Sequence, residues 1–235
     1  MARVSTGSYD LNKWLSGGYE TDIISIIYGG SGAGKTNFCL CAAVSQAVKG
    51  NRVVYIDTEG GFSSERVKQI VSGKKDFKEG DVENTLANIL LLKPTSFNEQ
   101  EKAFEILVKE IKQHVSLIIV DGMTILYRLD AAEAKEKNNG ELQKINALLA
   151  RQMRILAEIA RKHEIPIIVT NQVYKWEENM HMVGGDIMKY WGKCHIELVK
   201  EDGKRVAYLR KHRSLPEKEI SFEIVNEGIR KRGWL

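Results

Sequence analysis

The chain has 235 residues, with 35 basic and 31 acidic side chains and a formal net charge of +4 at pH 7. Hydrophobic residues make up 43% and charged residues 28%, a composition that excludes a disordered chain and supplies enough apolar side chains for a sizeable core. No run reaches the roughly 18 apolar residues of a membrane span, and no apolar secretion core begins the chain. We therefore expect a cytoplasmic protein that folds as one domain over residues 1–235.

Apolar runs rich in β-branched residues alternate with longer amphipathic stretches along the chain. The first five runs are nearly continuous, which is typical of strands buried on both faces of a parallel sheet; they are 22–29, 51–59, 87–94, 115–122 and 165–172. The helical patterns among them are 35–49, 63–72, 98–114 and 141–163. This alternation predicts an α/β fold with a mostly parallel central sheet.

The C-terminal part has a different pattern. Its runs, 194–200, 204–211 and 220–226, are shorter and alternate more. Asp202-Gly203 stands between the first two and is a strong hairpin signal, so we expect an antiparallel extension of the sheet. Residues 200–235 hold ten basic and six acidic side chains and so carry the whole net charge. Such an excess favours an anionic partner, although a solvated surface is the commoner explanation.

The three cysteines, Cys39, Cys41 and Cys194, cannot all form disulfides. They also have too few cysteine or histidine neighbours in the sequence for a zinc site. We expect them to be small, reduced core residues.

A phosphate-binding loop follows the first apolar run. The segment fits G-x-x-x-x-G-K-[ST] and consists of Gly29, Gly30, Ser31, Gly32, Ala33, Gly34, Lys35 and Thr36. Its glycines allow backbone N–H groups to reach phosphate oxygens at a helix N-terminus. Lys35 would place its charge between the β- and γ-phosphates, and the Thr36 hydroxyl would bind Mg²⁺. The loop predicts an ATP and Mg²⁺ site; a glycine-rich turn without a ligand is the alternative.

Three further apolar runs end in polar residues with suitable chemistry. Asp121 could supply the carboxylate that Mg²⁺ needs, or only cap a turn. Glu59 could activate the attacking water as a general base, or be a surface carboxylate. Gln172 could bond the γ-phosphate and lose that bond after hydrolysis, or simply begin a loop. Because parallel strands share one edge at their carboxyl ends, these side chains are expected near the phosphate loop.

The residues at these strand ends, in this order along the chain, resemble those of the RecA superfamily. The segments 55–62 (YIDTEGGF) and 170–173 (TNQV), with Thr6-Gly7-Ser8 near the start, are similar to the strand-exchange recombinases of archaea and eukaryotes. The resemblance runs from about residue 5 to the end. It implies a three-layer RecA-like P-loop NTPase fold, with the catalytic roles above for Lys35, Glu59 and Gln172.

The match begins almost at Met1, without the helical DNA-binding domain and docking motif that precede the core in full-length recombinases. We expect no such domain here, as in the RadB family of archaeal recombinase paralogues. The resemblance places Arg66 against the adenine, whereas the residues alone allow a solvated helix face. Ser31 and Gly32 stand where those enzymes have an aromatic residue and an arginine, so side-chain contacts from the loop would be lost.

DNA contact is expected from two segments read as loops, 128–140 and 173–185, which the resemblance identifies with the DNA-binding loops of the superfamily. Basic residues there would meet phosphates, and Trp176 could stack on a base at ~1–3 kcal/mol. Both segments are close to neutral, so solvated loops are the alternative. Basic runs at 210–213 and 230–232 could also bind phosphates without reading sequence. The candidate contacts are Arg128, Lys135, Lys137, Lys175, Trp176, Arg230, Lys231 and Arg232.

These features lead to the hypothesis of a weak, Mg²⁺-dependent ATPase that binds single-stranded or branched DNA and assists a main recombinase in repair, close to the nucleoid. The resemblance adds a Holliday-junction resolvase as a partner and little strand exchange; homo-oligomerisation is left open. The alternatives are a hexameric RecA-fold motor, and a nucleotide-sensing interaction module in which hydrolysis is vestigial.

Overall fold

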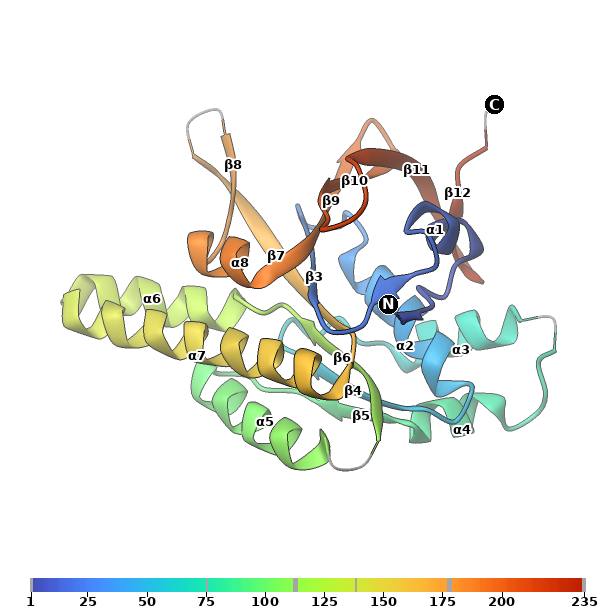
Figure 1. Ribbon diagram of the computed structural model, residues 1–235, viewed down its shortest axis with the longest axis horizontal. Helices are drawn as coiled ribbons and strands as arrows, with labels where there is room; N and C mark the ends of the chain where they lie inside the picture. Colours follow the sequence, from blue (N-terminus) through green and yellow to red (C-terminus); the bar gives the residue numbers. More distant parts are fainter. Residues whose placement is uncertain (1, 75, 112–113, 138, 177–178, 234–235) are drawn as a thin grey trace.

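The computed structural model describes residues 2–74, 76–111, 114–137, 139–176 and 179–233 (Figure 1). Its main sheet has the strand order β12-β11-β10-β9-β3-β7-β6-β4-β5, with β8 attached to β7. The parallel strands are β3 (Ile24–Gly29), β4 (Arg52–Asp57), β5 (Ile89–Leu92), β6 (Val115–Asp121), β7 (Ile167–Trp176) and β9 (Gly192–Glu201). All five long apolar runs are therefore strands, as predicted.

The C-terminal strands extend this sheet in antiparallel order, which confirms the predicted extension. They are β10 (Lys204–Lys211), β11 (Lys218–Val225) and β12 (Gly228–Lys231). The turn between β9 and β10 places Asp202 at φ 48° and Gly203 at φ 72°. Two consecutive residues with positive φ suit the right-handed twist of a hairpin, which is why Asp-Gly is favoured there. A separate small sheet pairs β1 (Arg3–Val4) with β2 (Tyr19–Glu20).

Helices cover both faces of the main sheet, so the fold has three layers (Figure 1). On one face lie α1 (Tyr9–Trp14), α2 (Lys35–Ala47), α3 (Ser64–Ser72) and α4 (Asp81–Ala87). On the other lie α5 (Phe97–Glu110), α6 (Ile125–Lys137), α7 (Asn139–His163) and α8 (Gly185–Trp191). Among the described residues, no helix is both long and apolar enough to cross a membrane.

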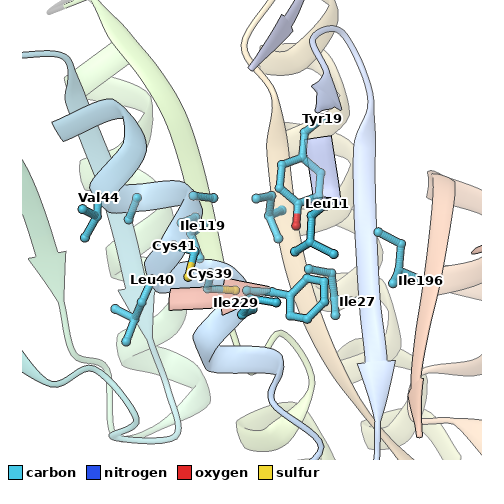
Figure 2. Close-up of a cluster of buried hydrophobic side chains, with 14 of the residues drawn as sticks. Leu11, Tyr19, Ile27, Cys39, Leu40, Cys41, Val44, Ile119, Ile196 and Ile229 are labelled. Carbon is cyan, nitrogen blue, oxygen red and sulfur yellow. The ribbon is translucent and has the colours of Figure 1, made fainter. Parts of the chain in front are cut away.

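Alternate residues of the buried strands enter two different cores. In β4, Val53 and Tyr55 pack on the α2 side, whereas Val54 and Ile56 pack on the α7 side. Figure 2 shows part of the α2-side core, where the buried Cys39 and Cys41 lie among apolar side chains from several elements. All three cysteines are buried and unpaired, which confirms them as core residues.

Both segments expected to be loops instead have regular structure. Residues 128–137 continue α6, and α7 begins at residue 139. The run of alanine, glutamate and lysine there favours a helix, and this local propensity outweighs the position that the family resemblance suggested. In the segment 173–185, β7 continues to Trp176 and pairs with β8 (Asn179–Met182), and α8 then begins at Gly185. The expectation of two irregular loops was therefore wrong.

Candidate nucleotide and metal site

The phosphate loop joins the end of β3 directly to the first turn of α2, as its sequence predicts. Gly30, Ser31 and Gly32 are exposed at its tip, whereas Ala33 is buried. The Lys35 ammonium group donates to the carbonyl oxygens of Gly29 and Gly30, both at 3.0 Å. The lysine therefore lies across the base of the loop, where its charge can meet a bound phosphate.

Burial lowers the pKa of Lys35, while the nearby carboxylates of Glu59 and Asp121 act in the opposite direction. An amine that has lost water interacts more strongly with an anion than a solvated amine does. A bound polyphosphate would therefore meet an ammonium group that has already lost part of its hydration.

Two hydroxyl groups hold the carboxylate of Asp121 at the end of β6. The Tyr55 hydroxyl donates to Oδ2 at 2.8 Å, and the Thr170 hydroxyl donates to Oδ1 at 2.7 Å. Thr170 also accepts the backbone N–H of Gly122 at 2.7 Å, which fixes the orientation of its hydroxyl. Asp121 is 1% exposed, so these bonds supply partners that water would otherwise provide.

The proposed Mg²⁺ ligands converge on the space next to Gly61. A Cβ added at Gly61 would lie 3.1 Å from Thr36 Oγ1 and 3.8 Å from Asp121 Oδ2. Hydroxyl and carboxylate oxygens are the protein ligands that Mg²⁺ prefers, and the absence of a side chain leaves room between them. The residues present therefore fit Mg²⁺, with Thr36 and Asp121 as the protein groups that would hold it. When bound, the ion would neutralise charge on the phosphates.

The loop that carries Glu59 is organised by Asp57, which sequence reasoning missed. The buried carboxylate of Asp57 accepts three backbone N–H groups, from Glu59 at 3.3 Å, Gly61 at 3.1 Å and Phe62 at 3.0 Å. The Asp57 side chain thus fixes the backbone of Glu59, the candidate base, and of Gly61, which borders the space between Thr36 and Asp121. The only sequence signal was a second acid two residues before Glu59.

Glu59 lies over the backbone of Gly122, immediately after Asp121. A Cβ at Gly122 would stand 2.7 Å from Glu59 Cγ and 3.1 Å from Oε1, and Gly122 has φ +99°. Only glycine permits both this backbone conformation and this approach. The side chain of Glu59 consequently reaches the same crevice as Asp121.

Gln172 completes the group from the neighbouring strand. In the parallel register of β3 and β7, Gln172 lies beside Gly29 at the start of the phosphate loop. Loss of water and the carboxylate of Asp121 raise the pKa of Glu59, while Lys35 and a side-chain hydrogen bond from Gln172 lower it. Four strand ends therefore bring Lys35, Glu59, Asp121 and Gln172 together.

Arg66 is engaged within the protein. Its guanidinium donates to Asn37 Oδ1 and Gln69 Oε1, both at 2.9 Å. It also donates to carbonyl oxygens of the β11–β12 turn: Val225 at 2.7 Å, Asn226 at 3.0 Å and Gly228 at 3.3 Å. Arg66 thus ties this turn to α2 and α3. The expected contact with adenine stays a prediction, and it would have to use the flat face of the guanidinium because the N–H groups are occupied.

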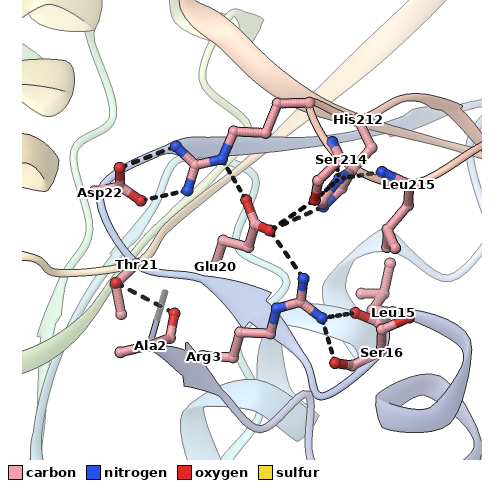
Figure 3. A network of polar contacts seen from close by, with 11 residues as sticks. Ala2, Arg3, Leu15, Ser16, Glu20, Thr21, Asp22, His212, Ser214 and Leu215 are labelled. Atoms are coloured by element: carbon pink, nitrogen blue, oxygen red, sulfur yellow. Dashed lines mark hydrogen bonds and ion pairs between the residues drawn. The ribbon is translucent and has the colours of Figure 1, made fainter.

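The basic run 210–213 is also engaged within the chain. Arg213 bonds Glu20 at 2.6 Å and Asp22 at 2.7 Å, next to His212, whose side chain is 3% exposed (Figure 3). Lys211 Nζ donates to the carbonyls of Lys189 at 3.1 Å and Gly192 at 3.0 Å, and Arg210 pairs with Glu197 at 2.7 Å. Arg213 thus ties β2 to the segment that follows β10.

The predicted DNA contacts occupy several separate places. Arg128 and Lys135 are exposed on α6, and Arg230 is exposed but paired with Glu223 at 2.6 Å. Lys231 and Arg232 lie at and just beyond the end of β12. The side chains of Lys137, Lys175 and Trp176 lie outside the part of the chain that the structure describes. A DNA-binding role for these residues remains a prediction.

Comparison with known proteins shows the family of this chain. A family model described as Rad51 matches residues 1–232. The DNA repair and recombination protein RadB of Methanocaldococcus jannaschii is 37% identical over 219 residues, which cover 93% of this chain and 98% of that protein. The protein of that name from Methanothermobacter thermautotrophicus is 35% identical over 239 residues, covering 97% of this chain and 95% of its own length. The chain therefore belongs to the Rad51 family and is RadB-like within it.

Proposed function

We propose that this protein is a weak, Mg²⁺-dependent ATPase that binds DNA and assists a main recombinase in repair and recombination. The observation that carries the ATPase proposal is the convergence of Lys35, Glu59, Asp121 and Gln172 at the carboxyl ends of neighbouring parallel strands. Membership of the Rad51 family supports the same activity. The repair role rests on the names of the RadB relatives.

Each residue has a distinct task in the proposed reaction. Lys35 and the loop N–H groups bind the phosphates, and Thr36 and Asp121 hold Mg²⁺. Glu59 accepts a proton from the attacking water through its carboxylate, which must be ionised to do so. Gln172 donates its amide N–H groups to Glu59 or to the terminal phosphate, and so positions the base while sensing the nucleotide.

Slow turnover is the expected behaviour of this site. Ser31 and Gly32 offer no long side chain to a developing negative charge, and such charge stabilisation often dominates the rate. Lys35 must also leave two carbonyl oxygens of its own loop before it can contact a phosphate.

The proposal also includes protein partners. The family resemblance suggests a main recombinase and a Holliday-junction resolvase as partners, and it allows a homo-oligomer.

ATP hydrolysis and DNA binding should be measured in the same preparation, with and without a full-length recombinase. We expect slow hydrolysis that disappears in Lys35→Ala and Glu59→Gln, together with DNA binding and a changed recombinase activity. Hydrolysis that is unaffected by both substitutions would contradict the assigned site. Ring-shaped particles with turnover stimulated many-fold by single-stranded DNA would instead favour a hexameric motor.

The hydrogen bond between Gln172 and Glu59 also supports a second candidate, a nucleotide-sensing module in which hydrolysis is dispensable. In that case Glu59→Gln would preserve repair in cells, whereas Lys35→Ala would abolish it. Equal loss in both variants would exclude the sensing module.

A further inference from the structure

Two hollows adjoin at the β12 end of the main sheet. The first, of about 740 Å³, lies between α1 and the C-terminal strands, and the second, of about 760 Å³, continues across β10 to β12. Lys231 and Arg232 line both, so we call them together the α1–β12 groove. The backbone N–H of Lys231 donates to Asp10 Oδ2 at 2.7 Å and fixes α1 against β12, as their neighbouring positions in Figure 1 indicate.

The groove carries unneutralised positive charge. Five of its basic side chains have no carboxylate within ion-pair distance in the described part of the chain; they are Lys13, Lys204, Arg205, Lys231 and Arg232. Arg205 Nε is buried and has no hydrogen-bond acceptor among the described residues, so this arginine retains an unsatisfied N–H donor. The groove also holds three carboxylates, Asp10, Glu219 and Glu223, against six basic side chains, because Arg230, which is paired with Glu223, lines it as well. Its side chains therefore keep a positive excess.

This free charge contrasts with the basic run 210–213. Arg210 and Arg213 are paired with carboxylates, and Lys211 donates to two backbone carbonyls. A phosphate arriving at that run would have to compete with existing partners. The α1–β12 groove presents its cations without this cost, so a polyanion is expected to prefer it.

An exposed aromatic ring stands at the same groove. Tyr9 lines the first hollow and is 80% exposed, so most of its surface is accessible to a ligand. An aromatic face next to lysines is the combination by which proteins hold single-stranded nucleic acids, since each unpaired base offers a ring to stack on. A paired duplex keeps its base faces covered, so Tyr9 favours a single strand.

We propose that the α1–β12 groove binds single-stranded DNA, with Lys13, Lys231 and Arg232 on the phosphates and Tyr9 stacked on a base. This inference rests on the proposed DNA-binding function and assigns a surface to it. The groove lies at the β12 edge of the main sheet, at the other end of the strand order from β5. It uses α1, which no motif in the sequence connects with DNA.

The test compares two triple variants of the full chain with equal loss of charge. The groove variant is Lys13→Gln/Lys231→Gln/Arg232→Gln, and the control is Arg154→Gln/Arg161→Gln/Lys162→Gln on the exposed side of α7. Binding to a fluorescent oligo-dT is measured by anisotropy at several salt concentrations. Three lost phosphate contacts should reduce the slope of log K against log salt by about 2 in the groove variant, because each contact on a single strand contributes roughly 0.7. The control should keep the wild-type slope.

Tyr9→Ala tests the stacking separately, with Tyr9→Phe as the matched control. We expect Tyr9→Ala to lose roughly 5- to 100-fold in affinity for oligo-dT while binding duplex DNA as the wild type does, and Tyr9→Phe to retain both affinities. Equal losses for single-strand and duplex DNA would overturn the single-strand assignment. If the groove variant binds DNA as tightly as the wild type, the groove is not the binding surface, although the protein still binds DNA. If the wild-type protein binds no DNA, the proposed DNA-binding function is wrong as well.

Discussion

Gly61→Ala should selectively damage the metal site. Gly61 does not have positive φ, so alanine can adopt its backbone conformation without strain. The new methyl group would lie 3.1 Å from Thr36 Oγ1, 3.3 Å from Thr36 Cγ2 and 3.8 Å from Asp121 Oδ2. The methyl group must therefore displace the threonine side chain by a few tenths of an ångström and occupy space between the two oxygens.

The expected magnitude follows from the geometry. Displacing a residue that orients a metal ligand typically lowers metal affinity by roughly 10- to 100-fold, which corresponds to about 1.4 to 2.8 kcal/mol. We expect Gly61→Ala to lose this amount of ATP affinity in the presence of Mg²⁺ and to match the wild type when EDTA replaces the metal. Lys35→Ala should lose affinity in both conditions, because Lys35 contacts the phosphates themselves.

Calorimetric titration of ATP into each variant, with and without Mg²⁺, measures these affinities directly. The thermal midpoint of Gly61→Ala without nucleotide should stay close to that of the wild type, which controls for misfolding. An equal loss of affinity with and without Mg²⁺, or no loss at all, would refute the placement of the metal between Thr36 and Asp121.

Three other substitutions test different parts of the structure. Gln172→Ala removes a hydrogen bond that lowers the pKa of Glu59, so the pKa of this base should rise and the acid limb of ATP hydrolysis should move to higher pH; an unmoved limb would contradict the Gln172–Glu59 contact. Arg66→Ala should lower the free energy of unfolding by about 2–3 kcal/mol in urea denaturation, because three backbone carbonyls of the β11–β12 turn lose a charged donor; a loss below ~0.5 kcal/mol would show that the turn does not depend on it. Burial lowers the pKa of His195 to about 4 from 6.5, so folding keeps the ring neutral and stability is lost as the pH falls through this window. The free energy of unfolding, measured by urea denaturation, should fall by about 3 kcal/mol between pH 6.5 and 4, and by less in His195→Gln. If stability falls equally with pH in both proteins, the role given to His195 is wrong.

The strands and the phosphate loop could be predicted because their signals are local. Each buried run is continuous in sequence, and the carboxyl ends of parallel strands must meet at one edge, so Glu59, Asp121 and Gln172 were identified without knowledge of the fold. The residues that hold them were missed. Tyr55 and Thr170 lie inside apolar strands, where their hydroxyl groups gave no sign that both bond the carboxylate of Asp121.

Contacts between distant parts of the chain were beyond sequence reasoning. Arg66 meets the β11–β12 turn about 160 residues away, and Arg213 meets Glu20 193 residues away. A basic residue has the same pattern in the sequence whether it faces solvent or a buried carboxylate. The segment 128–137 was misread for another reason, since family position was given more weight than a composition that favours a helix.

A crystal structure with Mg²⁺ and a non-hydrolysable ATP analogue would test the central claim most directly. The triphosphate should lie along residues 29–36, with the Lys35 ammonium moved from the carbonyls of Gly29 and Gly30 onto phosphate oxygens. The metal should lie beside Gly61, held by Thr36 and by Asp121 directly or through water, with Glu59 facing the terminal phosphate. An analogue bound elsewhere, or a metal with neither Thr36 nor Asp121 in its coordination sphere, would contradict the account.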